Sequence, residues 1–235
     1  YKPWPNVVKF LSQFPKGSLV LDCGCGNGKY LNCLPSTLQF IGFDRSYPLL
    51  RLSKEKGATE VLQADCETLV FRDGIMDGCI SVAVIHHLIT VESRAAAIKE
   101  MVRCTKIHGE ILVSVWAFEQ EKGTIGARQF DSQDVLVPWK LQKSHCAALD
   151  EKDTNFSSDV NAKLEDTSLP TQQPVCAAAE SSDLIMLKRY YHVFKRDELY
   201  NLCASIKNIQ VVDLYLHANN WIIILKKIEA TAKKA

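Results

Sequence analysis

VLDCGCGNGKYL, residues Val20–Leu31, carries the strongest fold signal in the chain. It begins within the apolar run Leu19–Leu21, which predicts a buried strand. Glycine then recurs at every second position from residue 24 to residue 28, and the chain from Lys29 onward predicts a helix. Only glycine lets the backbone turn sharply and come close to a ligand. A strand, a glycine turn and a helix in this order therefore predict the first βα unit of a nucleotide-binding sheet.

The acidic residue at the end of this strand, Asp22, indicates which ligands the turn could accept. The glycine spacing is GxGxG and differs from the GxGxxG of dinucleotide-binding folds. A carboxylate at this place would repel a pyrophosphate, but it suits a cationic or amine-bearing ligand. A purely structural turn without a ligand is the alternative for the glycines alone.

The composition is that of one globular α/β domain. The chain has 235 residues, of which 47% are hydrophobic, enough for a full core. Its formal net charge is +1, so RNA binding would require a local basic patch or a second subunit. No apolar run reaches membrane-spanning length and no secretory signal is visible. The start at Tyr1 instead of Met favours a fragment that lacks its own N-terminus.

The nine cysteines indicate neither a zinc module nor a disulfide framework. Their number is odd, and no two of them form a CxxC pair. Cys23 and Cys25 flank a turn glycine, where small packing residues are expected. A reducing compartment is the simpler interpretation.

Apolar periodicity predicts the remaining elements. Strands are predicted at residues 40–43, 60–63, 79–85, 110–116, 211–216 and 221–225, and helices at residues 7–14, 48–56 and 92–106. The charged residues of the last of these helices, Arg94 included, are expected to face solvent. Residues 143–184 are rich in Ser, Asp, Thr, Ala, Gln and Pro and show little periodicity, which predicts a disordered insertion.

Polar residues at the carboxyl ends of two predicted strands point to chemistry, because open α/β sheets bind their ligands there. Asp44 lies about twenty residues past the glycine turn, the place of the acid that hydrogen-bonds ribose hydroxyls; a helix N-cap with Ser46 is the alternative. His86 and His87 end the fourth strand, where a role toward the substrate competes with simple capping of the next helix. No third ligand lies at a suitable spacing, so no metal site is expected.

Several motifs carry a resemblance to a known family. They are YKPWP, CGCGNGKYL, GFDRS, AVIHHL, VWAFEQ, QDVLVPW, RYYHVF and NNWIIILKK. With them the chain resembles the eukaryotic tRNA wobble-uridine carboxyl methyltransferases, which are class I S-adenosylmethionine-dependent enzymes. The group includes the yeast-type single-domain enzyme and the methyltransferase domain of the AlkB-homologue tRNA hydroxylase. The resemblance covers nearly the whole chain except the insertion.

The resemblance implies a fold and a function. The fold is one α/β domain over residues 1–235, with a seven-stranded, mostly parallel sheet, a C-terminal antiparallel strand and helices on both faces. The function is methyl esterification of the 5-carboxymethyl group on uridine 34 of tRNA, with S-adenosylmethionine as cofactor. A small zinc-binding activator subunit is implied as partner, no membrane is involved, and the location is the cytoplasm, or the cytoplasm and nucleus. A methyltransferase of a small carboxylic acid and a catalytically weak S-adenosylmethionine-binding, RNA-associated module are the alternatives.

The site residues follow from these arguments together. The predicted cofactor contacts are Asp22, Gly24, Gly26, Asn27, Lys29, Tyr30, Asp44, Arg45, Asp65, Cys66 and Ile85. The predicted substrate contacts are Trp4, Arg94, Arg189, Tyr190 and Tyr191. Trp4 has a second interpretation as a core or lid aromatic. His86 and His87 are the catalytic candidates, which would orient the carboxylate or the uridine.

Overall fold

The computed structural model describes residues 2–34, 36–121, 123–124, 126–142 and 184–230. The disordered insertion predicted at residues 143–184 lies, apart from Leu184, outside the described residues. Contacts divide the chain into two compact units, one formed by Tyr1–Val135 with Tyr191–Ala235 and the other by Leu136–Tyr190. A single domain over residues 1–235 stays a prediction.

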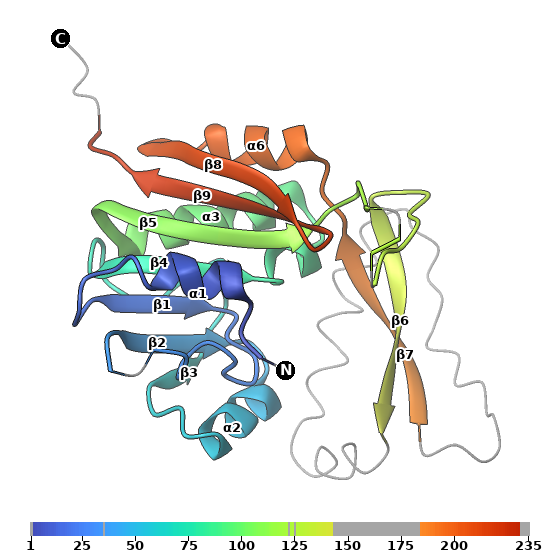
Figure 1. The fold of residues 1–235 in the computed structure, drawn as a ribbon, viewed down its shortest axis with the longest axis horizontal. Coiled ribbons are helices and arrows are strands. Elements are labelled where there is room, and N and C mark those ends of the chain that lie inside the picture. Colours follow the sequence, from blue (N-terminus) through green and yellow to red (C-terminus); the bar gives the residue numbers. More distant parts are fainter. Residues whose placement is uncertain (1, 35, 122, 125, 143–183, 231–235) are drawn as a thin grey trace. The chain divides into compact units, whose positions relative to one another are not determined.

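A seven-stranded sheet organises the first unit (Figure 1). Its strands are β1 (Leu19–Cys23), β2 (Gln39–Asp44), β3 (Val61–Gln63), β4 (Met76–Val82), β5 (Thr105–Trp116), β8 (Ile209–His217) and β9 (Asn220–Lys227). Their order is β3-β2-β1-β4-β5-β9-β8. Neighbours from β3 to β5 pair in parallel, whereas β9 pairs antiparallel with both β5 and β8. The predicted sheet, mostly parallel with a C-terminal antiparallel strand, is confirmed.

Apolar side chains cover both faces of this sheet, which is why its strands are nearly continuous apolar runs. The helices are α1 (Pro5–Leu11), α2 (Tyr47–Glu55), α3 (Val91–Cys104) and α6 (Arg196–Ala204). Along β1, Val20 enters the core cluster of α1 and α2, to which Leu50 belongs. The next residue, Leu21, enters the cluster of α3 and α6, to which Leu199 belongs. In Figure 1, α1 lies in front of the sheet and α3 behind it.

The helix predicted from Lys29 onward is wrong. Residues 24–34 form turns instead. Gly24, Gly26 and Gly28 all have positive φ, at 76°, 54° and 76°, and such dihedrals keep the chain out of a right-handed helix. The apolar residues that suggested a helix bury their side chains in the cluster of α1 instead.

The fourth strand ends earlier than predicted, at Val82 instead of Ile85. Ala83 has φ +62°, which turns the chain out of the sheet. Ile85–His87 then form a short 3₁₀ helix, η1. The two histidines are therefore presented by this helix and not by the strand itself.

The expectation that Arg94 faces solvent is also wrong. Its side chain is 3% exposed, and Nη1 donates to the carbonyl oxygens of Leu88 at 3.0 Å and Ile89 at 3.2 Å. The guanidinium carbon also lies 5.6 Å from the centre of the Phe194 ring. These contacts hold the segment that follows η1, because backbone carbonyls buried there need donors.

A two-stranded sheet of β6 (Asp134–Gln142) and β7 (Leu184–His192) completes the described chain, and the sequence analysis did not predict it. Strand β6 begins in the first unit and continues into the second, and β7 begins in the second unit and ends in the first. None of the described helices is long and apolar enough to cross a membrane.

Candidate functional site

The candidate site lies where the parallel strands of the first unit end. The arrowheads of β1, β2, β4 and β5 lie at one edge of the sheet in Figure 1. Asp22 and Asp44 stand at the ends of β1 and β2, and η1 follows β4. Predicted cofactor contacts and predicted catalytic residues therefore come from neighbouring strands, at the edge where such sheets bind ligands.

Backbone hydrogen bonds fix the glycine turn against β2. The amides of Gly24 and Cys25 both donate to the carbonyl of Phe43, at 2.9 and 2.8 Å. The amide of Gly26 donates to Oδ2 of Asp44 at 2.8 Å. The turn is thus held in place from the next strand, which leaves its surface rigid for a ligand.

Asp22 is the most unusual group of the site. Its side chain is 2% exposed, and its Oδ2 is buried with no hydrogen-bond partner among the described residues. Burial, reinforced by the charge of Asp44, raises the pKa of Asp22 to about 7. A buried carboxyl oxygen without a donor is unfavourable unless a ligand supplies one. This geometry fits an amine-bearing cation, as the sequence predicts.

Asp44 links the glycine turn to the start of α2. Its Oδ1 accepts from the amide of Ser46 at 2.8 Å while Oδ2 accepts from Gly26. Ser46 itself occupies the N-cap position of α2, so Asp44 is not the cap. Each carboxylate oxygen has a second lone pair, which leaves Asp44 able to accept from ribose hydroxyls.

Asp65 and Cys66 follow β3 at the same edge. Asp65 is exposed, and its Oδ1 accepts from the amide of Glu67 at 3.0 Å. Cys66 is half-buried, and burial raises the pKa of its thiol to about 12, so the thiol stays neutral. A carboxylate beside a neutral thiol can accept from an adenine amino group. The role of this pair toward the adenine stays a prediction.

Three other predicted cofactor contacts differ in exposure. The side chains of Asn27 and Arg45 are exposed, whereas Ile85 is 1% exposed and belongs to the core. The carbonyl of Asn27 accepts from Lys56 at 3.3 Å, which ties the glycine turn to the end of α2. Their roles toward a cofactor stay predictions.

Trp4, Lys29 and Tyr30 lie together beside the glycine turn. The Nζ of Lys29 is 5.1 Å from the centre of the Trp4 ring and 5.5 Å from that of Tyr30. Burial lowers the pKa of Lys29 and raises that of Tyr30 to about 12. Trp4 is half-buried and packs against the core, which agrees with its interpretation as a core aromatic. Its role as a substrate contact stays a prediction.

Beyond η1, the structure brings four aromatic side chains together, which we call the aromatic cluster: His86, His87, Trp116 and Tyr191. Tyr191 lies 5.1 Å from His86 and 4.4 Å from His87 between ring centres, and it stacks on Trp116 at 4.2 Å with 12° between the planes. Both predicted catalytic residues and one predicted substrate contact are therefore neighbours.

One hydrogen bond sets the tautomer of the buried ring of His86. Its Nδ1 lies 3.1 Å from the backbone amide of Trp116 and accepts from it. In the neutral imidazole the proton then resides on Nε2. His86 in this state can donate from Nε2 but cannot take up a proton there.

Three residues of this region were missed from the sequence. Trp116 ends β5, and the ring of Phe130 and the guanidinium of Arg128 lie 6.4 and 5.1 Å from its ring centre. Trp116 ends a predicted strand as His86 does, but the sequence analysis considered only polar residues at strand ends. Arg128 lies in a loop and carried no comparable signal.

The predicted substrate contacts Arg189 and Tyr190 belong to the second unit. Arg189 is exposed and Tyr190 is half-buried on β7. Their role toward the site of the first unit stays a prediction.

His192 follows Tyr191 and holds the end of β7. Its Nδ1 lies 2.8 Å from Oδ1 of Asp134 and its Nε2 lies 2.7 Å from Oε1 of Glu198, while Gln133 bonds the other oxygen of Glu198. Burial alone would raise the pKa of Glu198, but the hydrogen bonds from His192 and Gln133 outweigh it and hold this pKa below its usual value.

Replacing Glu198 by Gln is expected to lower the free energy of unfolding by about 1–3 kcal/mol at neutral pH, because His192 loses a charged acceptor. A carboxylate whose folded-state pKa is lowered stabilises the fold above its unfolded pKa and loses this effect as pH falls. The difference between wild type and Glu198→Gln in urea unfolding should therefore shrink from about pH 7 to about pH 4. Asp197→Asn, at an exposed position of α6, is the control and should change little; equal effects of both variants would contradict the account.

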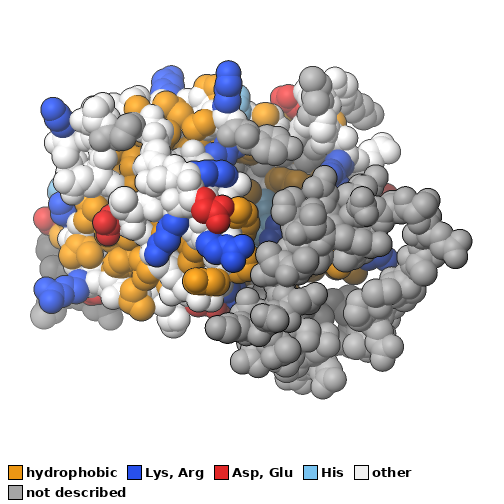
Figure 2. All heavy atoms as spheres, turned by 90° about the horizontal axis from the view of Figure 1, so that it is seen from below, with side chains coloured by type: hydrophobic (Ala, Val, Ile, Leu, Met, Phe, Trp, Pro, Cys, Tyr) orange, Lys and Arg blue, Asp and Glu red, His pale blue; other side chains and the backbone are white. Residues whose placement is uncertain are grey.

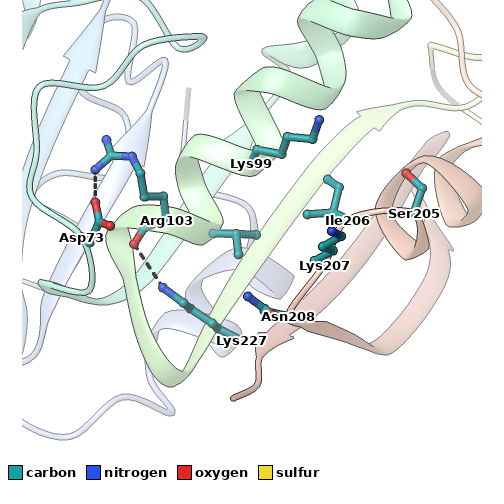
Figure 3. Close-up of a pocket in the computed structure, with 9 residues that line it drawn as sticks. Asp73, Lys99, Arg103, Ser205, Ile206, Lys207, Asn208 and Lys227 are labelled. Carbon is teal, nitrogen blue, oxygen red and sulfur yellow. Dashed lines mark hydrogen bonds and ion pairs between the residues drawn. The ribbon is translucent and has the colours of Figure 1, made fainter. Parts of the chain in front are cut away.

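A cavity of about 510 Å³ lies at the opposite edge of the sheet (Figure 3). It is lined by Asp73, Lys99, Val102, Arg103, Ser205, Ile206, Lys207, Asn208 and Lys227. Figure 3 shows Arg103 paired with Asp73, at 2.6 Å, and Lys227 donating to the carbonyl of Arg103, at 3.1 Å. Because these cations hold the end of α3, the cavity is a structural feature and not the candidate site. Within the described ranges, no three His, Cys, Asp or Glu side chains are grouped to hold a metal ion.

Comparison with known proteins shows the family of the chain. Residues 21–113 match the family model described as methyltransferase domain. The tRNA (carboxymethyluridine(34)-5-O)-methyltransferase of Schizosaccharomyces pombe is 32% identical over 97% of this chain and 89% of that protein. A protein of the same name from Xenopus tropicalis is 34% identical over 97% of this chain, which spans 38% of that relative's length.

A solved structure shares the fold. S-adenosylmethionine-bound CalS10, an amino pentose methyltransferase from Micromonospora echinaspora, aligns with a TM-score of 0.61 at 14% identity, over 96% of this chain and 92% of that chain. The sheet order and the glycine turn described above are thus those of the class I methyltransferase fold. Together with the near full-length match to the fission yeast protein, this shows that the chain belongs to the tRNA (carboxymethyluridine(34)-5-O)-methyltransferase family.

Proposed function

We propose that this protein transfers a methyl group from S-adenosylmethionine to the carboxylate of 5-carboxymethyluridine at position 34 of tRNA. The observation that carries the proposal is the buried, unpartnered carboxyl oxygen of Asp22, at the same sheet edge as the aromatic cluster. This arrangement supports a site for an amine-bearing cofactor and a site for a planar acceptor at one edge of the sheet. The activity named for the fission yeast relative supports the choice of acceptor.

The residues at the glycine turn fit the cofactor group by group. When bound, S-adenosylmethionine supplies an electrophilic methyl group on a sulfonium. Asp22 would hold the amino group, because its Oδ2 is buried without a donor among the described residues. Asp44 would accept from the ribose hydroxyls, and Asp65 with Cys66 would meet the adenine.

The acceptor side needs alignment and no general base. A carboxylic acid with a pKa near ~4 is ionised at neutral pH and is already a nucleophile. The tautomer of His86 agrees, because its Nε2 carries a proton and can donate to a carboxylate oxygen. His87 and Tyr191 lie 4.4 Å apart between ring centres, and aromatic rings of this kind are what bases stack on. Correct placement of two reactants can lower a barrier by roughly 7–11 kcal/mol.

A partner subunit is part of the proposal. The net charge is +1, and Figure 2 shows basic side chains scattered among apolar and uncharged ones on one face of the described chain. Strand β3 forms an edge of the sheet, and Tyr47, Leu52 and Val70 expose 57%, 42% and 72% of their surface in α2 and after β3. An exposed edge strand with apolar neighbours is ordinarily covered. A small zinc-binding activator at this edge would cover it and add RNA-binding surface.

Tritium transfer from labelled S-adenosylmethionine to bulk tRNA lacking the ester tests this proposal, with and without the activator. We expect label in tRNA, stronger with the activator, and a methyl ester of 5-carboxymethyluridine in the nucleoside digest. A methyltransferase of a small carboxylic acid would instead label free acids and ignore the activator. Cofactor binding without transfer to either acceptor would favour a catalytically weak binding module.

A further inference from the structure

The loop that follows β5 is tied to the β8–β9 turn by side chains. Gln120 donates from Nε2 to the carbonyl of Asn219 at 3.3 Å and to that of Ala117 at 2.6 Å. Asn219 accepts at Oδ1 from the amide of Glu121 at 2.9 Å and donates from Nδ2 to Thr124 at 2.8 Å. Asn219 is 7% exposed and has φ +62°, so its side chain is held in one place. The loop after β5 and the β8–β9 turn, which are distant in sequence, therefore hold each other in place.

The same network reaches the far end of the loop. Trp221 donates from Nε1 to Oε2 of Glu119 at 2.9 Å, and Oε1 of Gln120 accepts from the amide of Arg128 at 3.3 Å. Glu119, Gln120 and Trp221 come from the motifs VWAFEQ and NNWIIILKK, which the cofactor site does not use. Through Gln120, the network holds the backbone amide of Arg128.

The guanidinium of Arg128 lies over the aromatic cluster. Its central carbon is 5.1 Å from the centre of the Trp116 ring, and Trp116 stacks on Tyr191. No carboxylate pairs with Arg128 in the part of the chain that the structure describes. Two other cations near the candidate site have different surroundings, because Arg94 is buried against carbonyls and Lys29 lies beside Trp4.

We propose that Arg128 binds the carboxylate of the methyl acceptor and selects acidic over neutral acceptors. A guanidinium stacked on an aromatic ring keeps its edge N–H groups free to bond both oxygens of a carboxylate. The inference rests on the proposed function only in taking the acceptor to be a carboxylic acid. It assigns the selection to one residue of a loop that the sequence analysis left without a role.

The reaction itself predicts which kinetic constant Arg128 controls. The carboxylate oxygen forms a bond to the methyl carbon as the carbon–sulfur bond breaks, and the carboxylate charge disappears in the ester. An ion pair to Arg128 therefore stabilises the bound acceptor at least as much as the transition state. Loss of this pair should raise KM for the acceptor without lowering kcat to the same degree.

Binding of two matched RNAs to the protein loaded with S-adenosylhomocysteine tests the inference. One anticodon stem-loop carries 5-carboxymethyluridine at position 34, and the other carries the neutral amide, 5-carbamoylmethyluridine. We expect wild type to prefer the acid by about 10- to 100-fold, the range of one charged hydrogen-bonded pair. Arg128→Met should lose this preference, and Arg128→Lys should retain part of it. Lys195→Met is the matched control, because Lys195 is exposed and lies 5.2 Å from the ring of Phe118.

The outcomes separate this inference from the proposed function. A wild-type preference that persists in Arg128→Met, or equal binding of acid and amide by wild type, would overturn the role of Arg128. A preference that depends on Arg128 without methyl transfer by wild type would support the inference and overturn the proposed function. Kinetics of the transfer give a second readout, since a loss confined to kcat would also contradict carboxylate binding by Arg128.

Discussion

Replacing Asp22 by Asn is expected to weaken S-adenosylmethionine binding by about 100-fold at neutral pH. The amide keeps the shape of the side chain but removes the charge that would pair with the amino group of the cofactor. The reason for so large an effect is burial, because Asp22 is 2% exposed and water cannot substitute for the lost partner. Isothermal titration of wild type and variant with S-adenosylmethionine and S-adenosylhomocysteine measures the loss.

The pH dependence of S-adenosylmethionine binding is a second test of the role of Asp22. The pKa of Asp22 in the free protein is raised to about 7, chiefly by burial, so much of the carboxyl is protonated below neutral pH. A cationic ligand favours the ionised form, and affinity should rise up to about tenfold per pH unit below that pKa. Above about pH 8 the amino group of the cofactor itself loses its proton, and affinity should fall. Asp22→Asn should abolish the acidic limb alone.

The same substitution should not destabilise the free protein. A carboxyl group with a raised folded-state pKa does not change the free energy of unfolding below its unfolded-state pKa. Between the two pKa values it lowers the free energy of unfolding progressively as pH rises. Because the pKa of Asp22 is raised from 3.8 to about 7, its carboxyl group lowers the free energy of unfolding by at most about 4 kcal/mol. Without cofactor, Asp22→Asn should be at least as stable as wild type at about pH 8. Asp213→Asn, at an exposed position of β8, serves as the control. If Asp22→Asn binds S-adenosylmethionine within threefold of wild type, the role of Asp22 is contradicted.

Replacing Gly24 by Ala is expected to destabilise the protein by about 3 kcal/mol and to abolish measurable cofactor binding. Gly24 has φ +76°, where an L side chain is strained, and its added Cβ would lie 2.4 Å from Cγ2 and 2.8 Å from Cγ1 of Val84. Val84 is β-branched, so a single rotation does not remove both contacts. Because Val84 directly precedes η1, a shift there would also move His86.

Two further variants separate the clash from the strain. Gly17→Ala is the matched control, because Gly17 has φ +88° but nothing lies within 4 Å of its added Cβ. It should cost about 1 kcal/mol in urea unfolding. The double variant Gly24→Ala with Val84→Ala should recover the part of the loss that the clash causes. Equal losses for Gly17→Ala and Gly24→Ala would show that Val84 plays no part.

The sheet could be predicted because its signals are local and repeated. Apolar runs ending in Asp22 and Asp44 marked β1 and β2, and the glycines between them required a sharp turn. The last two strands followed from apolar runs on either side of a polar turn. In parallel sheets the strand ends also specify the ligand edge, which is why Asp22, Asp44 and His86 were selected together.

The errors arose where tertiary contacts override local pattern. Arg94 has the sequence position of a solvent-facing helix residue, yet its guanidinium is buried where it donates to the carbonyls of Leu88 and Ile89 after η1. The helix expected after the glycine turn does not form, because its apolar residues Tyr30 and Leu31 are needed in the core beside α1. The position of Arg128 depends on Asn219, about ninety residues later in the chain, and no local pattern reveals such a pairing.

Transfer of a deuterated methyl group to a defined RNA is the most direct test of methyl transfer to the carboxylate of 5-carboxymethyluridine. The acceptor is the anticodon stem-loop with 5-carboxymethyluridine at position 34, the donor is S-adenosylmethionine with a CD₃ group, and the activator subunit is present. We expect a nucleoside that has gained the intact CD₃ group as an ester, from which mild alkali releases CD₃OH and restores 5-carboxymethyluridine. Label that survives alkali, or label on the amide-bearing stem-loop at the same rate, would contradict methyl transfer to the carboxylate.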